Sequence, residues 1–326
     1  MGLKIIVMGT GPFALPTFEW LVQSEHDVCL LVTRPIVDAG KRRKTAANPV
    51  RDFAESVPGL PIFAPANIND SESVQRLNEC QADLLFVCDY GQILKNPCLA
   101  SARLGGINLH GSLLPKYRGA APINWAVYHG DSIMGVTVIH MTPKLDGGPE
   151  LAKRSMQVEI QDTAETLEPR LAELGVEAVQ ASLAELQAWD GESPLGNPQD
   201  STQVTKAPRL RKPQGNLDWN RSAVELLNQV RAFQPWPGSF THWLPTEGTP
   251  LRLILHRVTV VEAAAEPAEA GTVMHADAEA IVVATGAGCL AIHELQPAGK
   301  RKMDCGEFLR GKKVAKGDRL GPLPSK

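Results

Sequence analysis

The first part of the chain alternates short apolar runs with longer segments in which apolar residues recur at helical spacing. The apolar runs have the length of strands buried on both faces of a sheet. The predicted strands are 3–8, 28–32, 83–88, 107–110 and 135–141. The predicted helices are 16–22, 49–57, 71–79, 123–129 and 164–189, the last with an early interruption at Pro169. Strands that alternate with helices in this way predict an α/β domain with a doubly wound parallel sheet.

The pattern changes after residue 189. Residues 190–213 carry four prolines with Gly, Ser and Gln between them, which is typical of a linker. A short amphipathic helix at 223–232 precedes strand-like runs separated by Gly and Pro, at 239–244, 251–261, 271–275, 280–285 and 289–295. Such short strands predict a small β-barrel. The predicted organisation is a Rossmann-like α/β domain at 1–189, a linker at 190–213, and an OB-like barrel domain at 214–326.

Composition narrows the class of protein. At 326 residues and 43% hydrophobic, the chain has material for about two packed domains, which argues against disorder. No apolar run is long enough to cross a bilayer, and the first residues read as a strand entering a turn rather than as a signal sequence. The six cysteines form no C-x-x-C pair and no zinc-ligand spacing. We therefore expect a cytoplasmic protein with reduced thiols and no metal.

The net charge of −3 hides an asymmetry between the two parts of the chain. Residues 1–205 carry a net charge of −8, and residues 206–326 a net charge of +5. A separate basic run, Lys41–Lys44, follows a glycine in a predicted loop. Basic segments of this kind suit contacts with a polyanion, although a solvated charged surface gives similar counts. Charge alone leaves both interpretations open.

The first predicted strand runs into the turn Gly9 to Ala14, which fits the dinucleotide-binding pattern G-x-G-x-x-A in its weaker form. Pro12 has no N–H to offer a pyrophosphate, and the second strand ends in Thr33-Arg34, with no acid to hold a ribose. These features argue against a nicotinamide cofactor, including NADP held through Arg34. Phe13 either lines a pocket or belongs to the core.

The most unusual stretch is 105–122, GGINLHGSLLPKYRGAAP. Asn108 and His110 are two residues apart on a predicted strand, so their side chains point to the same face and can meet one ligand. The glycines and prolines that follow prevent a regular helix. In an open α/β sheet, ligands bind beyond the carboxyl ends of the strands, where this pair is expected. The alternative is a buried strand whose His bonds a backbone carbonyl.

Asp146 follows the predicted strand 135–141 at a Gly-rich exit, where flexible backbone can bring a carboxylate close to a ligand. An Asp before Gly is also a common turn former. Together with Asn108 and His110 it would supply an oxyanion donor, a proton carrier and a group that orients the imidazole. Ser112, the nearby hydroxyl in a nucleophile's position, lacks the G-x-S-x-G elbow, and no Cys is close. The set suits acyl transfer to an external nucleophile without a covalent enzyme intermediate.

These residues resemble the signature of a known family. Asn108-x-His110, the run 112–123 and Leu145-Asp146-x-Gly148 look like the motifs of the formyltransferases that use 10-formyltetrahydrofolate. The resemblance extends over essentially the whole chain and is strongest to the members whose acceptor is methionyl-initiator tRNA. The other matching segments are 9–14, 40–44, 90–94, 231–237 and 295–300. The departures from the family pattern are Asp89, Gly147, Pro149 and the order Gly11-Pro12.

The resemblance implies transfer of the formyl group of 10-formyltetrahydrofolate to the α-amine of methionyl-initiator tRNA, for translation initiation. It implies direct attack of the amine through a tetrahedral intermediate, with Asn108 and His110 stabilising the oxyanion and Asp146 holding His110 and assisting proton removal. The implied folate-binding residues are Tyr90, Gln92, Ile93, Leu94, Ser112, Leu113, Leu114 and Pro115. The implied tRNA-binding residues are Phe13, Lys41, Arg42, Arg43, Lys44 and Arg118. It also implies a monomer without a metal.

Three rival functions stay open at this point. A formyltransferase acting on a UDP-amino sugar would share the Asn, His and Asp, but it would not be expected to carry a basic barrel. A hydrolase that releases formate from the folate would use water and would not need a second, basic domain. A non-enzymatic RNA-binding protein would account for the charge and leave the polar set unused.

Overall fold

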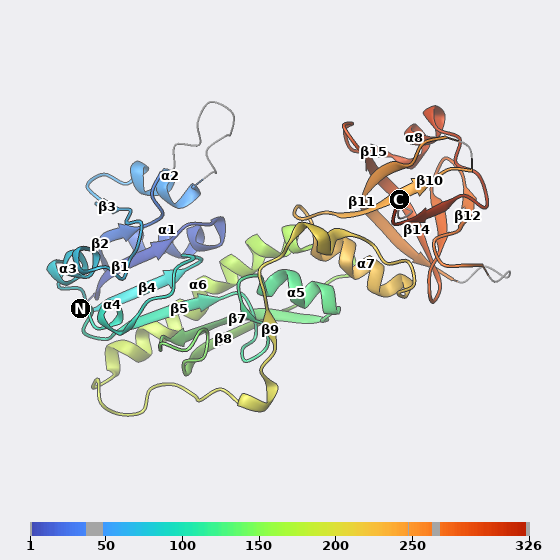
Figure 1. The fold of residues 1–326 in the computed structure, drawn as a ribbon. Coiled ribbons are helices and arrows are strands. Elements are labelled where there is room, and N and C mark those ends of the chain that lie inside the picture. Colours follow the sequence, from blue (N-terminus) through green and yellow to red (C-terminus); the bar gives the residue numbers. More distant parts are fainter. Residues whose placement is uncertain (1, 37–47, 247, 263–267, 324–326) are drawn as a thin grey trace. The chain divides into compact units, whose positions relative to one another are not determined.

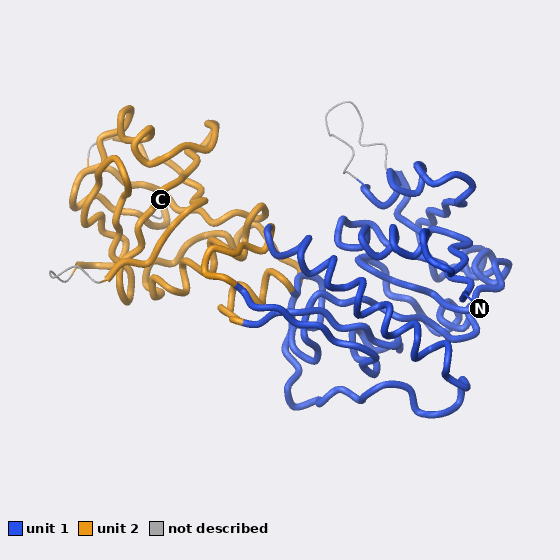
Figure 2. Tube along the Cα trace, turned by 180° about the vertical axis from the view of Figure 1, so that it is seen from behind, with its two compact units in different colours: residues 1–122, 133–158, 166–208 blue, residues 123–132, 159–165, 209–326 orange. Residues whose placement is uncertain are grey.

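The structure is a computed structural model that describes residues 2–36, 48–246, 248–262 and 268–323 (Figure 1). The basic run Lys41–Lys44 lies outside the described residues. The chain divides into two compact units (Figure 2). Unit 1 comprises 1–122, 133–158 and 166–208, and unit 2 comprises 123–132, 159–165 and 209–326.

Unit 1 is built on a seven-stranded sheet with the order β3-β2-β1-β4-β5-β7-β8. Its strands are β1 (Lys4–Gly9), β2 (Asp27–Val32), β3 (Ile62–Phe63), β4 (Leu84–Cys88), β5 (Gly106–His110), β7 (Ile133–His140) and β8 (Glu150–Gln157). The strands from β3 to β5 pair in parallel, whereas β7 is antiparallel to β5 and β8 is antiparallel to β7. The predicted parallel α/β fold is confirmed, and it carries an antiparallel edge that was not predicted.

The pattern of apolar residues did not predict the antiparallel edge, because β8 is largely polar. Its residues include Lys153 and Arg154, and burial alternates along its second half, as expected for a strand with one face toward solvent. The central strands β1 and β4 are instead buried almost throughout. Runs of apolar residues therefore revealed the middle of the sheet and not its border.

The helices of unit 1 largely follow the predicted spacing. They are η1 (Pro12–Ala14), α1 (Leu15–Gln23), α2 (Pro49–Ser56), α3 (Ser71–Glu79), α4 (Asn96–Leu99) and α6 (Ala164–Ala188). At the start of α3, Asp70 accepts a hydrogen bond from the backbone N–H of Ser73 at 2.8 Å. The helix α6 continues through Pro169, so the interruption predicted there does not occur. Pro169 lacks the N–H that would bond the backbone oxygen of Glu165, so α6 loses that one hydrogen bond and continues.

The core of unit 1 forms where α1 packs on the sheet. Phe18 of α1 meets Phe86 of β4 edge to face, with ring centroids 5.6 Å apart, and both side chains are fully buried. Ile6 and Met8 of β1 belong to a second buried cluster with Leu85 of β4. The central strands are therefore a rigid frame for the loops at their carboxyl ends.

The segment predicted as a linker is bonded to the rest of unit 1. Its short strand β9 (Lys206–Ala207) pairs in parallel with β6 (Arg118–Gly119). Asn197 exchanges two backbone hydrogen bonds of 2.8 Å with Glu150. Two 3-10 helices, η2 (Ser201–Gln203) and η3 (Lys212–Gly215), lie in or next to it. Backbone pairing of this kind leaves no periodic side-chain pattern, so composition did not reveal it.

Unit 2 is an antiparallel barrel with helices α5 (Pro122–His129), α7 (Ala223–Ala232) and α8 (Cys305–Gly311). Its strands are β10 (Ser239–Leu244), β11 (Leu251–Val261), β12 (Val273–Ala276), β13 (Ile281–Ala284), β14 (Cys289–Pro297), β15 (Met303–Asp304) and β16 (Arg319–Gly321). They follow the order β12-β13-β14-β11-β10-β16, with β15 paired to β14. An isolated bridge between Thr272 and Arg319 links the two ends, so the sheet closes almost completely. The predicted small β-barrel is confirmed.

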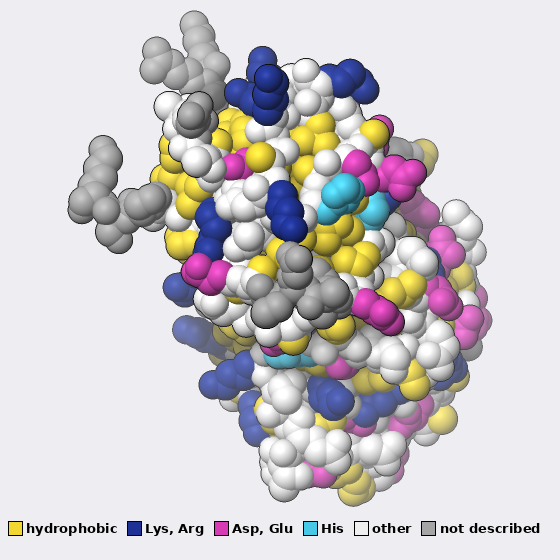
Figure 3. Space-filling view, turned by 90° about the vertical axis from the view of Figure 1, so that its right-hand side faces the viewer, with side chains coloured by type: hydrophobic (Ala, Val, Ile, Leu, Met, Phe, Trp, Pro, Cys, Tyr) yellow, Lys and Arg dark blue, Asp and Glu magenta, His cyan; other side chains and the backbone are white. Residues whose placement is uncertain are grey.

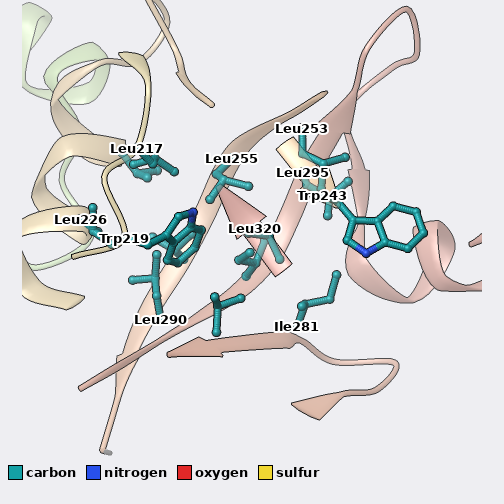
Figure 4. Close-up of a cluster of buried hydrophobic side chains, with 14 of the residues drawn as sticks. Leu217, Trp219, Leu226, Trp243, Leu253, Leu255, Ile281, Leu290, Leu295 and Leu320 are labelled. Carbon is teal, nitrogen blue, oxygen red and sulfur yellow. The ribbon is translucent and has the colours of Figure 1, made fainter. Parts of the chain in front are cut away.

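The core of unit 2 surrounds two tryptophans (Figure 4). Trp219 donates its indole N–H to Oγ1 of Thr241 at 3.0 Å, and Trp243 donates to Oδ2 of Asp318 at 2.9 Å. The surrounding leucines include Leu226, Leu253, Leu255, Leu290, Leu295 and Leu320. Because both indole donors have partners, these large side chains are buried without an unsatisfied polar group.

Candidate active site

Asn108 and His110 lie at the carboxyl end of β5, which is bonded to β4 on one side and β7 on the other. Their positions, two residues apart, place them on the same face of the strand. Asn108 is half-buried, and His110 is only 6% exposed. The face predicted to meet a ligand is therefore largely shielded from water, which strengthens polar contacts made there.

His110 has a neighbour at each ring nitrogen. Its Nε2 lies 2.9 Å from the backbone oxygen of Tyr117, and its Nδ1 lies 3.8 Å from Oδ2 of Asp146. A carbonyl oxygen only accepts, so Nε2 carries the hydrogen in this arrangement. Nδ1 is then the nitrogen that can exchange a proton. Both roles considered for this histidine, bonding a carbonyl and facing a carboxylate, occur together.

Asp146 lies in the loop between β7 and β8, where its backbone has a positive φ of 47°. Its Oδ2 accepts a hydrogen bond from the backbone N–H of Gly119 at 2.8 Å. The same oxygen faces His110, so one carboxylate oxygen links the loop after β5 to the loop after β7. A positive φ is uncommon for a residue other than glycine, so this conformation depends on its surroundings.

The loop after β5 is held from the neighbouring strands. Buried Thr137 of β7 donates its hydroxyl to the backbone oxygen of Ser112 at 2.7 Å and accepts from the N–H of Leu114 at 3.0 Å. Lys153 of β8 donates to the backbone oxygen of Leu114. The Ser112 hydroxyl itself donates to the backbone oxygen of Lys116 at 2.7 Å. The apolar residues predicted for folate here are the buried Leu114 and the half-buried Leu113 and Pro115.

The turn after β4 contains the other residues predicted for folate. Tyr90 is 5% exposed within the apolar core, burial raises its pKa, and its hydroxyl has no hydrogen-bond partner among the described residues. The side-chain oxygen of Gln92 accepts from the N–H of Ile68 at 3.0 Å. Leu94 is buried, whereas Ile93 is 61% exposed. Ile93 is therefore the member of this turn that offers apolar surface to a ligand.

Among the residues predicted for tRNA, Phe13 is buried in η1, at 7% exposure. Arg118 donates from Nε and from a terminal nitrogen to Oε1 of Gln199, at 3.1 and 2.6 Å. The remaining four, Lys41–Lys44, lie outside the described residues. The structure thus gives Arg118 a partner inside unit 1.

Several polar residues at this site were missed by sequence reasoning. Gln199 donates to backbone oxygens of the Asp146 loop, and Thr205 accepts from the N–H of Tyr117 at 2.8 Å. Thr137 and Lys153 hold the loop after β5. Each of these residues bonds backbone atoms that are distant in sequence. Such bonds leave no periodic pattern, so residue spacing offered no signal for them.

The cysteines do not suit covalent catalysis. All six are free thiols, and burial raises the pKa of Cys98 to about 12 and the pKa values of Cys29 and Cys305 to about 11. A thiol with such a pKa stays protonated near neutral pH and is a poor nucleophile. In the described ranges, no three His, Cys, Asp or Glu residues are grouped to hold a metal. No helix among the same residues is long and apolar enough to span a membrane.

The α/β unit carries Asn108 and His110 at the carboxyl end of β5 and Asp146 in the loop after β7, and a barrel unit accompanies it. This arrangement is that of a two-domain enzyme whose polar groups suit group transfer. Two family models match the chain, "Formyl transferase" over residues 3–183 and "Formyl transferase, C-terminal domain" over residues 209–313. The chain belongs to the formyl transferase family.

Relatives of nearly equal length support this assignment. The methionyl-tRNA formyltransferase of Rhodopirellula baltica is 45% identical, with 98% of this chain and 96% of that protein covered. The methionyl-tRNA formyltransferase of Methylococcus capsulatus is 41% identical, with 98% and 100% covered.

Solved structures share the fold at low sequence identity. HypX from Aquifex aeolicus in complex with tetrahydrofolic acid aligns with a TM-score of 0.61 at 17% identity, covering 97% of this chain and 51% of that chain. The N-formyltransferase from Helicobacter canadensis aligns with a TM-score of 0.63 at 14% identity, covering 89% and 98%. The fold of this chain therefore recurs in both proteins at low sequence identity.

Proposed function

We propose that the protein transfers the formyl group of 10-formyltetrahydrofolate to the α-amine of methionyl-initiator tRNA. The product, N-formylmethionyl-tRNA, would start translation in the cytoplasm. The observation that carries the proposal is the full-length similarity of 45% and 41% to two methionyl-tRNA formyltransferases. The His110–Asp146 pair at the end of the sheet supplies groups suited to the chemistry.

In this proposal the amine attacks the formyl carbon directly. A bond forms between the amine nitrogen and that carbon, and the bond from the carbon to N10 of the folate breaks. Asn108 and His110 stabilise the oxyanion of the tetrahedral intermediate. Asp146 holds His110 and assists removal of the amine proton, and a proton passes to the departing N10. Positioning the two substrates can contribute about 7–11 kcal/mol, whereas one oxyanion donor contributes roughly 3 kcal/mol.

Folate binding is assigned to the two loops that follow β4 and β5. The exposed Ile93 and the half-buried Leu113 and Pro115 offer apolar surface for a pterin ring. Gln92 adjoins Ile93 in the sequence, and Ser112, whose backbone oxygen is bonded by Thr137, adjoins Leu113. Both segments offer polar groups to the folate. The proposed contacts also include Tyr90, Leu94 and Leu114. No metal enters the proposed reaction.

RNA binding is assigned to the basic segments and to the barrel domain at 214–326, with the domain at 1–189 carrying the chemistry. Residues 206–326 have a net charge of +5, and Lys41–Lys44 add four cations. Figure 3 shows Lys and Arg side chains exposed on the face that it draws. Exposed cations suit contacts with a phosphate backbone. We propose that the enzyme acts as a monomer, with Phe13 and Arg118 near the acceptor end.

A formyl-transfer assay tests the proposal. It compares methionylated initiator tRNA, methionylated elongator tRNA and free methionine as acceptors, with 10-formyltetrahydrofolate as donor. Strong preference for the charged initiator is the expected result. Transfer without that preference, or release of formate alone, would retain the folate chemistry and overturn the tRNA assignment.

A further inference from the structure

Gln199 lies in the Pro-rich stretch after α6, in a part of the chain whose composition predicted only a linker. It is half-buried, unlike its exposed neighbours Pro198 and Asp200. The backbone two residues earlier, at Asn197, pairs with Glu150 through two hydrogen bonds of 2.8 Å. The side chain of Gln199 is therefore held against unit 1 rather than free in solvent.

The Gln199 amide uses its full hydrogen-bonding capacity. Its Nε2 donates to the backbone oxygen of Asp146 at 2.8 Å and to that of Gly148 at 2.7 Å. Its Oε1 accepts from Nε of Arg118 at 3.1 Å and from a terminal guanidinium nitrogen at 2.6 Å. A carboxamide has two N–H donors and two acceptor lone pairs, and all four are occupied here. The contacts join three segments that are distant in sequence.

The hydrogen bonds from Gln199 hold a turn whose backbone conformation is unusual. Asp146 has a φ of 47°, and Gly147 and Gly148 follow it. Positive φ at a non-glycine residue costs free energy, and adjacent glycines allow many other conformations. By fixing the carbonyls of Asp146 and Gly148, Gln199 selects one conformation of this turn. That conformation places the Asp146 carboxylate 3.8 Å from His110 and 2.8 Å from the N–H of Gly119.

Arg118 determines which way the Gln199 amide faces. Its two hydrogen bonds hold Oε1, so Nε2 is directed at the two carbonyls. A flipped amide would place its oxygen against two carbonyl oxygens and its amino group against a guanidinium. Both contacts would be repulsive, so the arrangement has one stable orientation.

We propose that Gln199 is a positioning residue for Asp146, oriented in turn by Arg118. The proposal deepens the proposed function, because it rests on Asp146 acting with His110. The side chain of Gln199 bonds Arg118 and the backbone of the Asp146 loop, and Gln199 is not among the proposed substrate contacts. It keeps the Asp146 carboxylate where it can hold the imidazole and take part in proton removal.

Two substitutions separate the contacts of Gln199. Gln199→Ala removes all of them. Gln199→Glu keeps an acceptor for Arg118 but replaces the donor to Asp146 and Gly148 by a carboxylate oxygen. Both variants should therefore lower kcat, by about 10-fold to 100-fold, since a displacement of about 1 Å at a catalytic group has effects of that size. KM for the folate should stay within about twofold, because Gln199 bonds Arg118 and the backbone of the Asp146 loop and none of the proposed folate-binding residues.

Gln203→Ala is the matched control. Gln203 lies four residues further along the same segment, is exposed, and bonds Asp200 through its side chain at 2.9 Å. This variant should keep the wild-type kcat. A Gln199→Glu enzyme as active as wild type would overturn the proposal, because it would show that only the contact with Arg118 matters.

A double-mutant cycle distinguishes positioning from general destabilisation. If Gln199 acts through Asp146, Gln199→Ala should change kcat by less than about threefold when Asp146 is already Asn. A merely structural role would lower kcat equally in both backgrounds. Persistence of the full effect in the Asp146→Asn background would overturn the proposal.

A readout independent of activity completes the test. The N–H of Gly119 bonds the Asp146 carboxylate, so its hydrogen exchange in the wild type and in Gln199→Ala reports the position of that carboxylate. Exchange should be roughly 10-fold faster in Gln199→Ala, and unchanged exchange would overturn the proposal. Failure of the wild type to formylate charged initiator tRNA would contradict the proposed function. An active wild type with an unaffected Gln199→Ala variant would contradict only the inference.

Discussion

The two units use their buried polar groups differently. In unit 1, the bonds around Asp146 join one loop to another and leave the apolar core untouched. In unit 2, Asp318 and Thr241 bond the two tryptophans inside the core. Loss of a polar group should therefore slow the reaction in unit 1 and destabilise the fold in unit 2. Burial of a polar residue therefore does not by itself identify a catalytic one.

The largest expected effect is on the rate, at Asn108. Asn108→Ala should lower kcat by about 10²-fold to 10³-fold, because it removes one donor to the oxyanion. The melting temperature should change little, since the side chain is only half-buried at a strand end. Single-turnover formyl transfer and thermal unfolding measure the two effects. Asn78→Ala, on the exposed side of α3, is the control. A kcat within threefold of wild type would remove Asn108 from the mechanism.

The counterpart in unit 2 is Asp318→Ala. Asp318 is 4% exposed and accepts hydrogen bonds from Trp243, Thr246 and the N–H of Ala315. Without it, buried donors lose their partner, which should reduce the free energy of unfolding by about 2–3 kcal/mol. Urea unfolding measures this loss, and activity per folded molecule should be unchanged. Exposed Glu279→Ala should leave stability near wild type. An Asp318→Ala variant that is as stable as wild type but reacts more slowly would contradict the assignment of Asp318 to stability alone.

At Gly119, one substitution should reduce both stability and reaction rate, because this residue belongs to the β6–β9 pair and also bonds Asp146. Its φ is 130°, and an added Cβ would lie 2.5 Å from the backbone oxygen of Ala207 in β9. Gly119→Ala should therefore disturb both the β6–β9 pair and the bond to Asp146. We expect a loss of about 1–2 kcal/mol in stability together with a kcat roughly 10-fold lower.

Gly59→Ala is the control for Gly119→Ala. Gly59 also has a positive φ, of 79°, but nothing lies within 4 Å of an added Cβ. It should cost about 1 kcal/mol of stability with no change in kcat. Equal kinetic effects of the two substitutions would show that backbone strain, and not the contact with Asp146, controls the rate.

Acid should weaken unit 2 through Asp318. Burial alone would raise the pKa of Asp318, but the hydrogen bonds from Ala315, Trp243 and Thr246 outweigh it and hold the pKa below its usual value. A depressed folded pKa means that the carboxylate contributes stability above its unfolded pKa of about 4, and this contribution is lost as the pH falls through the folded pKa. Urea unfolding at pH 7 and at pH 3 measures the loss. Asp318→Asn should show a smaller acid-induced loss than wild type, and an equal loss would contradict this assignment.

The smallest effect should come from an exposed ion pair of unit 2. A terminal guanidinium nitrogen of Arg301 lies 2.6 Å from Oε1 of Glu307, and the arginine side chain is 71% exposed. Arg301→Ala should change stability by less than about 1 kcal/mol, because solvent and salt screen such pairs. A loss above about 2 kcal/mol in thermal or urea unfolding would show that surface charges also stabilise this fold.

The central strands of unit 1 and the barrel strands could be predicted because burial dictates their apolar patterns. The pair Asn108 and His110 could be proposed because a strand has a period of two. The antiparallel edge at β8 was missed because its residues are mostly polar. Gln199 was missed for a different reason: its role depends on backbone atoms that only the folded chain brings near. Catalytic candidates thus follow from local pattern, whereas the residues that hold them do not.

The division of the chain into units limits how such genes can recombine. Unit 2 is assembled from three separate stretches, and α5 comes from the chain between β6 and β7. In unit 2, Asn124 of α5 donates to the backbone oxygen of Ala232 at 2.8 Å, and Tyr128 stacks on Phe233 with centroids 5.4 Å apart. A genetic crossover within 190–213 would take the barrel from one parent and α5 from the other. A working chimera must therefore carry α5 from the same parent as its barrel.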